Sequence, residues 1–193
     1  MTKSRQMYKT GVIHGRFQIL HNDHLRYLLA GKALSKHLVV GITNPDPFLS
    51  KNEDADPNRS KPLYNPLTYY ERHIMLKKAL AYAGISHDDF TIVPFPINFP
   101  ERYKYYVPMD AVFFLSIYDD WGRRKLHYFR SMGIKTHVLR DVAPEKKGIS
   151  ATDIRHKIIT GQPWEHLVPD PVPPLIYQWK LPDRLKQLSF EDH

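Results

Sequence analysis

The stretch "TGVIHGRFQILHNDHLRYLLAGKALSKHLVVGIT", from Thr10 to Thr43, determines the fold class. Its first part combines β-branched and aromatic residues before a glycine-bearing break, which predicts a buried strand over Thr10–Phe17. A helix is predicted next, because apolar residues recur at helical spacing after a candidate N-cap at Asn22 or Asp23. The run "HLVVGIT" at the end, His37–Thr43, predicts a second buried strand.

The rest of the chain continues this alternation of strands and helices. Such alternation predicts an α/β fold with a mostly parallel sheet, because right-handed crossovers place helices on both of its faces. We expect residues 1–193 to form a single domain, with a flexible N-terminus at 1–9 and a C-terminal helical extension at 163–193. Further strands are predicted over Phe90–Phe95, Asp110–Ser116 and Ile134–Leu139, and further helices over Thr68–Gly84, over Asp120–Met132 and from Ser150 onward.

The composition favours a small anionic ligand. Lys and Arg outnumber Asp and Glu by 28 to 20, but they are scattered, and no nucleic-acid-binding motif is present, so we expect no nucleic-acid partner. The absence of cysteine excludes disulfides and thiolate metal sites and suits a reducing compartment. No apolar run approaches the roughly 20 residues of a bilayer span, so we expect a soluble, cytoplasmic protein without a membrane partner.

A long polar stretch, "NPDPFLSKNEDADPNRSKPLYNP" at Asn44–Pro66, predicts a loop. Loops of more than about 12 to 15 residues inside compact domains are often lids or binding loops, and a disordered segment is the equal alternative. As a lid, it would bring Lys51, Arg59 and Lys61 over a substrate.

Two histidines, His21 and His24, stand where the first predicted strand gives way to the first helix. Parallel α/β sheets bind ligands beyond the carboxyl ends of their strands, and a helix N-terminus offers unpaired N–H groups and partial positive charge. Imidazoles there can hydrogen-bond phosphate oxygens, and Arg16 can add a bidentate contact. Metal ligation would need a third ligand, and no HExxH-type pattern supports it. A helix start that binds no ligand is the remaining alternative.

A second helix start lies in "GISATDIRHKIITGQPWEHLVP", Gly148–Pro169. Ser150 is the predicted N-cap, with Asp153 at the matching capping-box position. Ser150 and Thr152 can offer hydroxyl and backbone N–H groups to a phosphate, and Arg155 adds positive charge about one turn on. The alternative is an ordinary capped helix.

Together the two segments resemble the nucleotidyltransferase superfamily, whose members carry an HxGH-type motif after the first strand and an ISxTxxR-type motif near the end. The closer resemblance is to the archaeal-type nicotinamide mononucleotide (NMN) adenylyltransferases, and it extends from about Gly11 to Val172. It is carried by "GRFQ" (Gly15–Gln18), by "NPLTYYER" (Asn65–Arg72), which resembles that family's NPxTxxER helix start, and by the second helix start with its "WEHLVP".

The resemblance implies a Rossmann-like, doubly wound parallel sheet of about five strands, with ATP and Mg²⁺ as the nucleotide and the metal. It implies transfer of AMP to the phosphate of a mononucleotide with release of pyrophosphate, in a protein that commonly assembles into homo-oligomers. The acceptor phosphate is already anionic, so alignment and charge neutralisation suffice without a catalytic base. By resemblance the ATP-binding residues are Gly15, Arg16, Phe17, His21, His24, Ser150, Thr152 and Arg155, of which His21, His24, Arg16 and Arg155 are also catalytic.

The chain departs from the family pattern at three positions. Asp23 replaces the Gly of HxGH, and a carboxylate beside a triphosphate is repelled unless it caps the helix or helps to hold the metal. Ala151 replaces the Gly of the second motif, a small change that preserves close backbone approach, and Ile19 replaces a Pro.

Asp119 and Asp120 follow a predicted strand and are interpreted as helix caps or, alternatively, as metal ligands. We assign no metal-ligating side chain.

The expected acceptor site lies near "RYKYYV", Arg102–Val107. In the family an aromatic residue stacks on the pyridine ring, and the resemblance places Tyr103 at that position, with Asn98 near the place of an upstream acidic residue. Alternatively Tyr103, Tyr105 and Tyr106 are ordinary core and surface aromatics.

The sequence thus favours transfer of AMP from ATP to NMN, which forms NAD and pyrophosphate. Two alternatives remain open. One is an adenylyl- or cytidylyltransferase that acts on a different phosphorylated acceptor. The other is a nucleotide-binding module in which Asp23 has impaired transfer.

Overall fold

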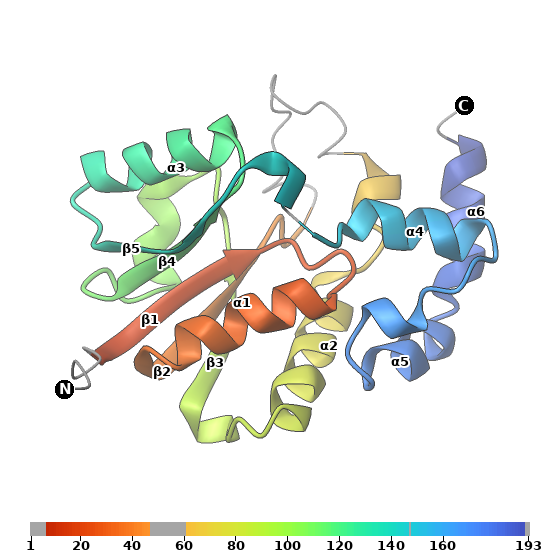
Figure 1. Cartoon of the computed structure of the whole chain (residues 1–193), viewed down its shortest axis with the longest axis horizontal. Helices are drawn as coiled ribbons and strands as arrows, with labels where there is room; N and C mark the ends of the chain where they lie inside the picture. Colours follow the sequence, from red (N-terminus) through yellow and green to blue (C-terminus); the bar gives the residue numbers. More distant parts are fainter. Residues whose placement is uncertain (1–6, 47–60, 147, 192–193) are drawn as a thin grey trace.

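The computed structural model describes residues 7–46, 61–146 and 148–191, whose strands form one sheet in the order β3-β2-β1-β4-β5 (Figure 1). Every pairing in this sheet is parallel. The order reverses between β1 and β4, which is where doubly wound sheets form a crevice for ligands. The predicted α/β, Rossmann-like fold of five parallel strands is therefore confirmed. The strands are β1 (Tyr8–Gly15), β2 (Ser35–Thr43), β3 (Phe90–Phe95), β4 (Val112–Ile117) and β5 (Thr136–Asp141).

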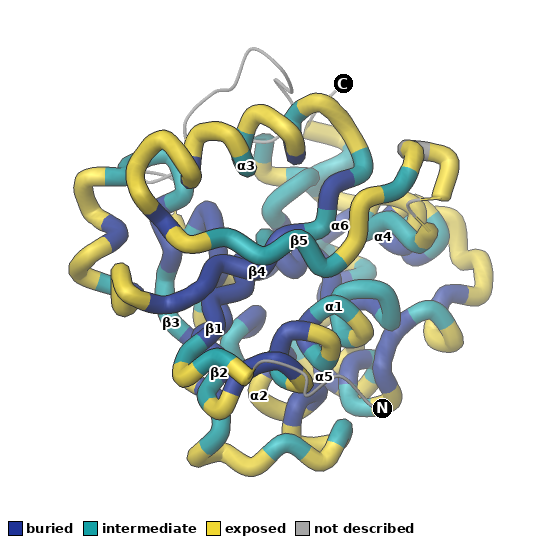
Figure 2. The backbone as a smooth tube through the Cα atoms, turned by 60° about the vertical axis from the view of Figure 1, so that its left-hand side comes forward, coloured by how far each residue is buried: buried dark blue, intermediate teal, exposed yellow. Residues whose placement is uncertain are grey.

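Helices cover both faces of the sheet, as predicted. Ile13 of β1 belongs to one hydrophobic cluster with Leu28 of α1, whereas its neighbour Val12 belongs to another with Phe129 of α3. Successive strand residues point to opposite faces, so one strand feeds both cores. Figure 2 shows the central strands buried and the outer surface of α3 exposed. The helices are α1 (Asn22–Lys32), α2 (Tyr69–Tyr82), α3 (Asp120–Ser131), α4 (Ala151–Ile159), α5 (Val172–Gln178) and α6 (Leu181–Glu191).

The element boundaries show which local signals were decisive. The predicted capping box at the start of α2 is confirmed, because the Thr68 hydroxyl accepts from the N–H of Glu71 while the Glu71 carboxylate accepts from the N–H of Thr68. The flexible N-terminus was predicted over residues 1–9, but β1 already begins at Tyr8, whose backbone N–H donates to the carbonyl of Leu34. Residues 1–6 lie outside the described part of the chain.

The helices α5 and α6 form the predicted C-terminal extension, and they pack into the hydrophobic cluster on the α1 side of the sheet. Leu175 and Leu185 are buried in the same cluster as Leu28. Arg184 of α6 donates to both carboxylate oxygens of Glu71 at 2.9 and 2.8 Å, so the extension is tied to the start of α2. Although burial opposes it, hydrogen bonding by Arg184 and Thr68 holds the pKa of Glu71 below its ordinary value.

The long polar loop is described only at its ends. Residues 47–60, which include Lys51 and Arg59, lie outside the described residues, and Lys61 precedes a short turn at Pro62–Tyr64. Within the described part of the chain, none of the helices is both long and apolar enough to cross a bilayer.

Candidate active site

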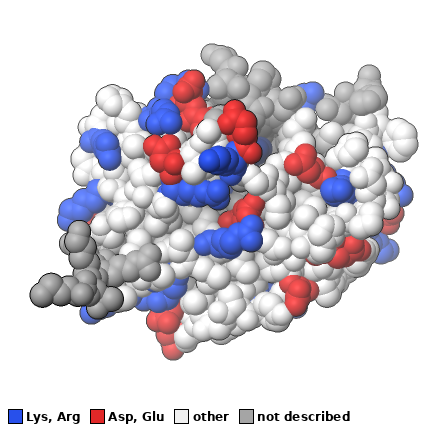
Figure 3. Space-filling view, viewed as in Figure 1, with Lys and Arg blue, Asp and Glu red and all other residues white. Residues whose placement is uncertain are grey.

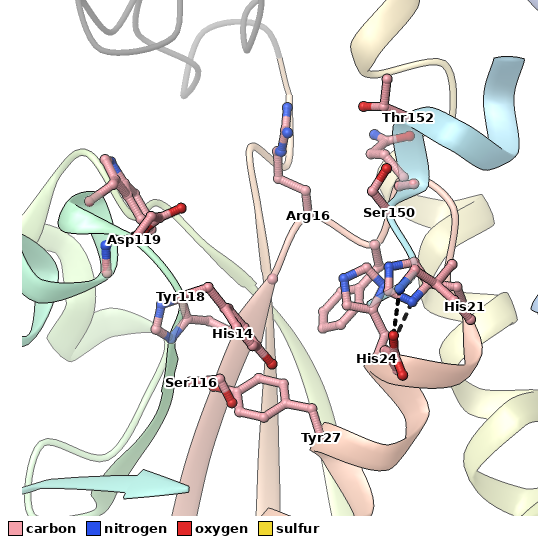
Figure 4. A pocket seen from close by; sticks show the side chains of 18 of the residues that line it. His14, Arg16, His21, His24, Tyr27, Ser116, Tyr118, Asp119, Ser150 and Thr152 are labelled. Carbon is pink, nitrogen blue, oxygen red and sulfur yellow. Dashed lines mark hydrogen bonds between the residues drawn. The ribbon is translucent and has the colours of Figure 1, made fainter. Parts of the chain in front are cut away.

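A pocket of about 310 Å³ opens at the carboxyl ends of β1 and β4, where the strand order reverses. The N-terminal ends of α1, α3 and α4 contribute to its walls. In Figure 4, His21 and His24 lie at the start of α1, Ser150 and Thr152 lie above them at the start of α4, and Arg16 projects upward between Asp119 and Ser150. Helix N-termini carry unpaired N–H groups and partial positive charge, so this pocket favours an anion.

His21 and His24 form a stacked pair at the start of α1, with ring centroids 3.6 Å apart and planes inclined by 20°. His21 is the N-cap of the helix, because its Nδ1 accepts a hydrogen bond from the backbone N–H of His24 at 3.3 Å. The prediction that Asn22 or Asp23 caps this helix is therefore wrong. His21 both caps α1 and lines the pocket.

His24 is held as a neutral imidazole with a free acceptor position. Burial, followed by the charge of His21, lowers the pKa of His24 well below its ordinary value. Its Nδ1 is buried and has no hydrogen-bond partner among the residues that the structure describes. Phe17, itself buried, supports the ring edge-on at a centroid distance of 5.2 Å. A phosphate in the pocket would favour the protonated form of His24, because only a protonated Nδ1 can donate a hydrogen bond to it.

The start of α4 forms the opposite wall. Ser150 is the N-cap, as predicted, and its Oγ accepts from the N–H of Asp153 at 3.1 Å. Arg155 is buried and donates to Thr152 Oγ1 at 2.9 Å and to the carbonyl of Gln18. Burial lowers the pKa of Arg155 to about 10, so the guanidinium stays charged at neutral pH. Arg155 thus brings positive charge to the pocket and joins α4 to the loop after β1.

Asp23 connects the two walls. Its Oδ2 accepts a hydrogen bond from the backbone N–H of Ile149 at 2.7 Å, and its Oδ1 pairs with Arg26. Gly148, with a φ of 84°, leaves room for this contact, because a Cβ there would collide with the carboxylate. The carboxylate that departs from the family pattern therefore holds the segment before α4 against α1, and Arg26 compensates its charge.

Arg72 holds the main chain beneath the pocket. Its buried guanidinium donates to the carbonyl oxygens of Thr43 and Asn44 at 2.8 Å, of Arg16 at 3.0 Å and of Thr68 at 3.2 Å. These carbonyls belong to the segments that follow β1 and β2 and to the start of α2. The "NPLTYYER" motif therefore contributes a structural brace below the site. Burial lowers the pKa of Arg72 to about 10, which leaves it charged.

A smaller pocket of about 150 Å³ adjoins the first. Two of its residues, Trp121 and Lys125, lie one turn apart on α3, and Lys125 Nζ is 4.3 Å from the centre of the Trp121 ring. The sequence interpretation assigned neither of them, nor His14, to the site. The sequence could have indicated them by position alone, because His14 lies near the end of β1 and Trp121 and Lys125 lie in the first turns of α3, at the edge of the sheet where ligands bind. The two pockets share His14, Gly15, Arg16, Trp121 and Lys125, and Thr43, Asn44 and Ile97 complete the smaller one.

The predicted acceptor residues lie elsewhere. Tyr103 is fully buried, stacks on Phe95 at a centroid distance of 4.6 Å and donates its hydroxyl to the carbonyl of Ile97. Neither Tyr103 nor Asn98 lines either pocket. Tyr103 is therefore a core aromatic, the alternative that the sequence left open, and Asn98 is not among the residues that line the two pockets, although its neighbour Ile97 lines the smaller one.

The larger pocket suits a metal that arrives with nucleotide phosphates. Asp119 caps α3, with its Oδ1 accepting from the N–H of Gly122 at 2.8 Å, and it lines the pocket together with Asp23. Over the residues described, no three His, Asp or Glu side chains are grouped to hold a metal. Mg²⁺ is usually bound by one or two carboxylates together with substrate phosphates. Asp119 fits that arrangement, whereas Asp23 is committed to Ile149 and Arg26.

Positive charge is concentrated inside the site. On the face shown in Figure 3, Lys and Arg side chains are interspersed with Asp and Glu. Arg16, Lys125 and Arg155 bring three cations to one cavity, which two carboxylates, Asp23 and Asp119, also line. This distribution fits a compact anionic ligand.

Comparisons with known proteins agree with this geometry. The family model described as Cytidylyltransferase-like matches residues 12–157. A phosphonoformate cytidylyltransferase from Streptomyces viridochromogenes is 48% identical over 183 residues, which are 95% of this chain and 98% of that protein. A nicotinamide-nucleotide adenylyltransferase from Thermococcus kodakarensis is 30% identical over 184 residues, 95% of this chain and 90% of that one. The resemblance to the nucleotidyltransferase superfamily is confirmed.

Solved structures give the same fold. A bifunctional NMN adenylyltransferase/ADP ribose pyrophosphatase from Francisella tularensis matches with a TM-score of 0.68 at 18% identity, over 96% of this chain and 54% of that one. Its complex with AMP and a manganese ion matches with a TM-score of 0.58 at 17% identity. At these identities the likeness concerns the fold alone.

Proposed function

We propose that this chain, which belongs to the cytidylyltransferase-like family, transfers a cytidylyl group from CTP to a small anionic acceptor such as phosphonoformate. The observation that carries this proposal is the 48% identity to the Streptomyces phosphonoformate cytidylyltransferase along nearly the whole of both chains. Transfer of AMP from ATP to NMN is the second candidate, supported by the adenylyltransferases at lower identity.

The smaller pocket supports an acceptor of small size. Its volume of about 150 Å³ is below the roughly 300–1,000 Å³ of pockets that enclose drug-sized ligands. Arg16 and Lys125 supply positive charge there, and Tyr103, which would have stacked on a pyridine ring, is buried in the core. An acceptor that carries a phosphonate and a carboxylate needs charge compensation more than an aromatic platform.

The proposed reaction requires no catalytic base. A phosphonate oxygen of the acceptor carries negative charge at neutral pH and attacks the α-phosphorus of CTP directly. A bond forms between that oxygen and the α-phosphorus, and the bond from the α-phosphorus to the bridging oxygen of the leaving group breaks. Pyrophosphate departs with the electron pair of the broken bond, so the protein has to align the two anions and neutralise their charge.

The walls of the larger pocket are suited to that task. His21, His24 and the N–H groups of α1 lie where they can bind the triphosphate near the reacting phosphorus, and Arg16 can bridge toward the acceptor. Ser150, Thr152 and the N–H groups of α4 can hold the β- and γ-phosphates that leave. Mg²⁺, held by these phosphates and Asp119, would neutralise charge on the departing pyrophosphate.

The proposal is tested by an acceptor panel. The protein is incubated with Mg²⁺ and either CTP or ATP, each with phosphonoformate, NMN, nicotinate mononucleotide or phosphopantetheine, and pyrophosphate release is measured. The expected result is stoichiometric pyrophosphate and a cytidylylated product with CTP and phosphonoformate. A matched variant, His24→Ala, is expected to lose this activity while still unfolding cooperatively.

Two outcomes would overturn the proposal. Faster turnover of ATP with NMN would restore the adenylyltransferase candidate. Tight nucleotide binding without pyrophosphate release from any acceptor would support the alternative of an impaired nucleotide-binding module.

Assembly and location are part of the same proposal. We expect residues 1–193 to act as one domain in a cytoplasmic homo-oligomer, with a nucleoside triphosphate and a small phosphorylated or phosphonylated acceptor as partners and without nucleic acid. Light scattering of the purified chain with and without CTP measures the oligomeric state, and a monomer under both conditions contradicts the expected assembly.

A further inference from the structure

His14 is a buried imidazole that the proposed mechanism does not use. It lies one residue before the end of β1 and belongs to the walls of both pockets. Only 7% of the residue is exposed, and within the described residues neither of its ring nitrogens has a hydrogen-bond partner. Leaving buried polar atoms unpaired is unfavourable, so the site is complementary to a ligand that supplies the missing partner.

The surroundings of His14 select an anion as that ligand. Burial, followed by the charge of Lys125, lowers the pKa of His14 well below its ordinary value, so the free imidazole is neutral with one N–H donor. Lys125 and Arg16 share both pockets with it. An oxyanion between these groups would accept from the imidazole while the two cations compensate its charge.

The position of His14 separates it from the phosphate-binding histidines. In Figure 4 it lies toward Tyr118, across the pocket from His21 and His24. A phosphonate directed at the nucleotide would therefore face His21 and His24, and the remaining acidic group of a small acceptor would point toward His14.

We propose that His14, together with Lys125, binds the second acidic group of the acceptor and thereby makes the enzyme specific for small acceptors that carry a carboxylate beside the reacting phosphonate. This inference deepens the proposed function and rests on it. Donation by His14 distinguishes such an acceptor from a simple alkylphosphonate, which leaves the imidazole nitrogens unpaired.

A purely structural role for His14 predicts a different response to substitution. The ring packs against Phe95 and Phe129 at centroid distances of 5.3 and 5.5 Å. His14→Leu fills the same space with an apolar side chain that has no hydrogen-bond donor, whereas His14→Gln retains a donor. If His14 only fills the core, Leu is tolerated at least as well as Gln.

The experiment compares phosphonoformate with methylphosphonate, which lacks the carboxylate. The KM for phosphonoformate as acceptor and the inhibition constant of methylphosphonate are measured for the wild-type protein, His14→Leu and His14→Gln, with His127→Leu on the exposed face of α3 as the control. His14→Leu is expected to raise the KM for phosphonoformate about 10- to 100-fold, the effect of losing a hydrogen bond to a charged group. The KM for CTP and the inhibition constant of methylphosphonate should stay unchanged, and His14→Gln should recover part of the loss.

A second measurement is independent of turnover. The imidazole ¹⁵N signals of His14, assigned by their absence in His14→Leu, are followed by NMR as phosphonoformate is added to the CTP-free protein. A shift that methylphosphonate does not produce supports the inference, even if the acceptor panel shows no transfer and the proposed function fails. Turnover of phosphonoformate with equal losses for both phosphonates in His14→Leu, or with no shift of these signals, would overturn the inference while the proposed function stands.

Discussion

The two halves of the active-site pocket are built in different ways. The nucleotide half consists of two helix starts, in each of which the cap bonds the residue three positions on, His21 with His24 and Ser150 with Asp153. The acceptor half is assembled from segments far apart in the sequence, the ends of β1 and β2, the turn after β3 and the first turns of α3. The proposed phosphate site is thus encoded locally, whereas the proposed acceptor site depends on how distant segments meet.

The largest expected effect tests the nucleotide half. His24→Ala removes an imidazole aimed at the triphosphate, and kcat should fall about 100- to 1,000-fold, as for loss of one donor to a transition-state oxyanion. The free energy of unfolding should change little, because the helix cap is His21. Steady-state kinetics and urea unfolding measure the two quantities. A kcat within a factor of about three of the wild type would remove His24 from the catalytic residues.

A change of similar size tests the brace beneath the acceptor half. Arg72→Met removes the side-chain donor to four carbonyl oxygens, of which only that of Thr68 keeps a backbone N–H partner in residue 72, and the free energy of unfolding should fall by about 3 kcal/mol. Because Thr43 and Asn44 line the smaller pocket, the KM for the acceptor should rise more than the KM for CTP. If Arg72→Met does not fold, the same two KM values are measured for Arg72→Lys, which keeps the positive charge but has fewer donors. Equal changes in both KM values would contradict the assignment.

Asp23→Gly tests the contact that joins the two walls. It restores the family residue but removes the hydrogen bond to the N–H of Ile149, so kcat should fall about tenfold and stability by about 1–2 kcal/mol. Asp23→Asn, which keeps an acceptor oxygen, should retain most of the activity. Higher turnover in Asp23→Gly would instead show that the carboxylate impairs transfer.

The smallest expected effect concerns pH and compares one histidine from each half. His14 and His24 have pKa values lowered below the ordinary 6.5, so between the lowered values and 6.5 the unfolded chain binds more protons than the folded one. The free energy of unfolding therefore has its full value above about pH 6.5. It decreases as the pH is lowered, by at most about 1.4 kcal/mol per pH unit for each histidine. Urea unfolding at about pH 7.5 and about pH 5.5 measures the slope. Pyrophosphate should flatten the slope contributed by His24, which is the slope that remains in His14→Leu, and should leave unchanged the slope contributed by His14, which is the difference between the wild type and His14→Leu. A slope that changes neither with pyrophosphate nor with His14→Leu would contradict the burial of the two imidazoles.

Much of the fold was predictable because its signals are local. The capping box at Thr68 and the N-cap at Ser150 fix the starts of α2 and α4 through bonds three residues apart, and the strand Phe90–Phe95 was predicted with its observed boundaries. The cap of α1 was missed, because an imidazole took the role that Asn and Asp usually fill.

The acceptor site was the least predictable part. The motif pointed to Tyr103, but the turn Pro100–Tyr105 directs that ring into the core beside Phe95, where its hydroxyl finds the carbonyl of Ile97. Trp121 and Lys125 face the pocket in its place, and their role depends on where α3 begins relative to the sheet. No spacing within "RYKYYV" reports on that distant packing.

The sequence by itself determined a parallel α/β sheet with the two helix starts to which we assign phosphate binding, because strand alternation and helix capping involve neighbours along the chain. The tertiary structure alone decided that Asp23 joins those starts, that Arg72 braces the strand ends and that the His14 imidazole finds no hydrogen-bond partner among the described residues where it lines both pockets. These contacts link residues far apart in sequence, and their existence depends on the packing of whole elements. In the proposed function, substrate choice therefore depends on long-range contacts, while phosphate binding depends on local ones.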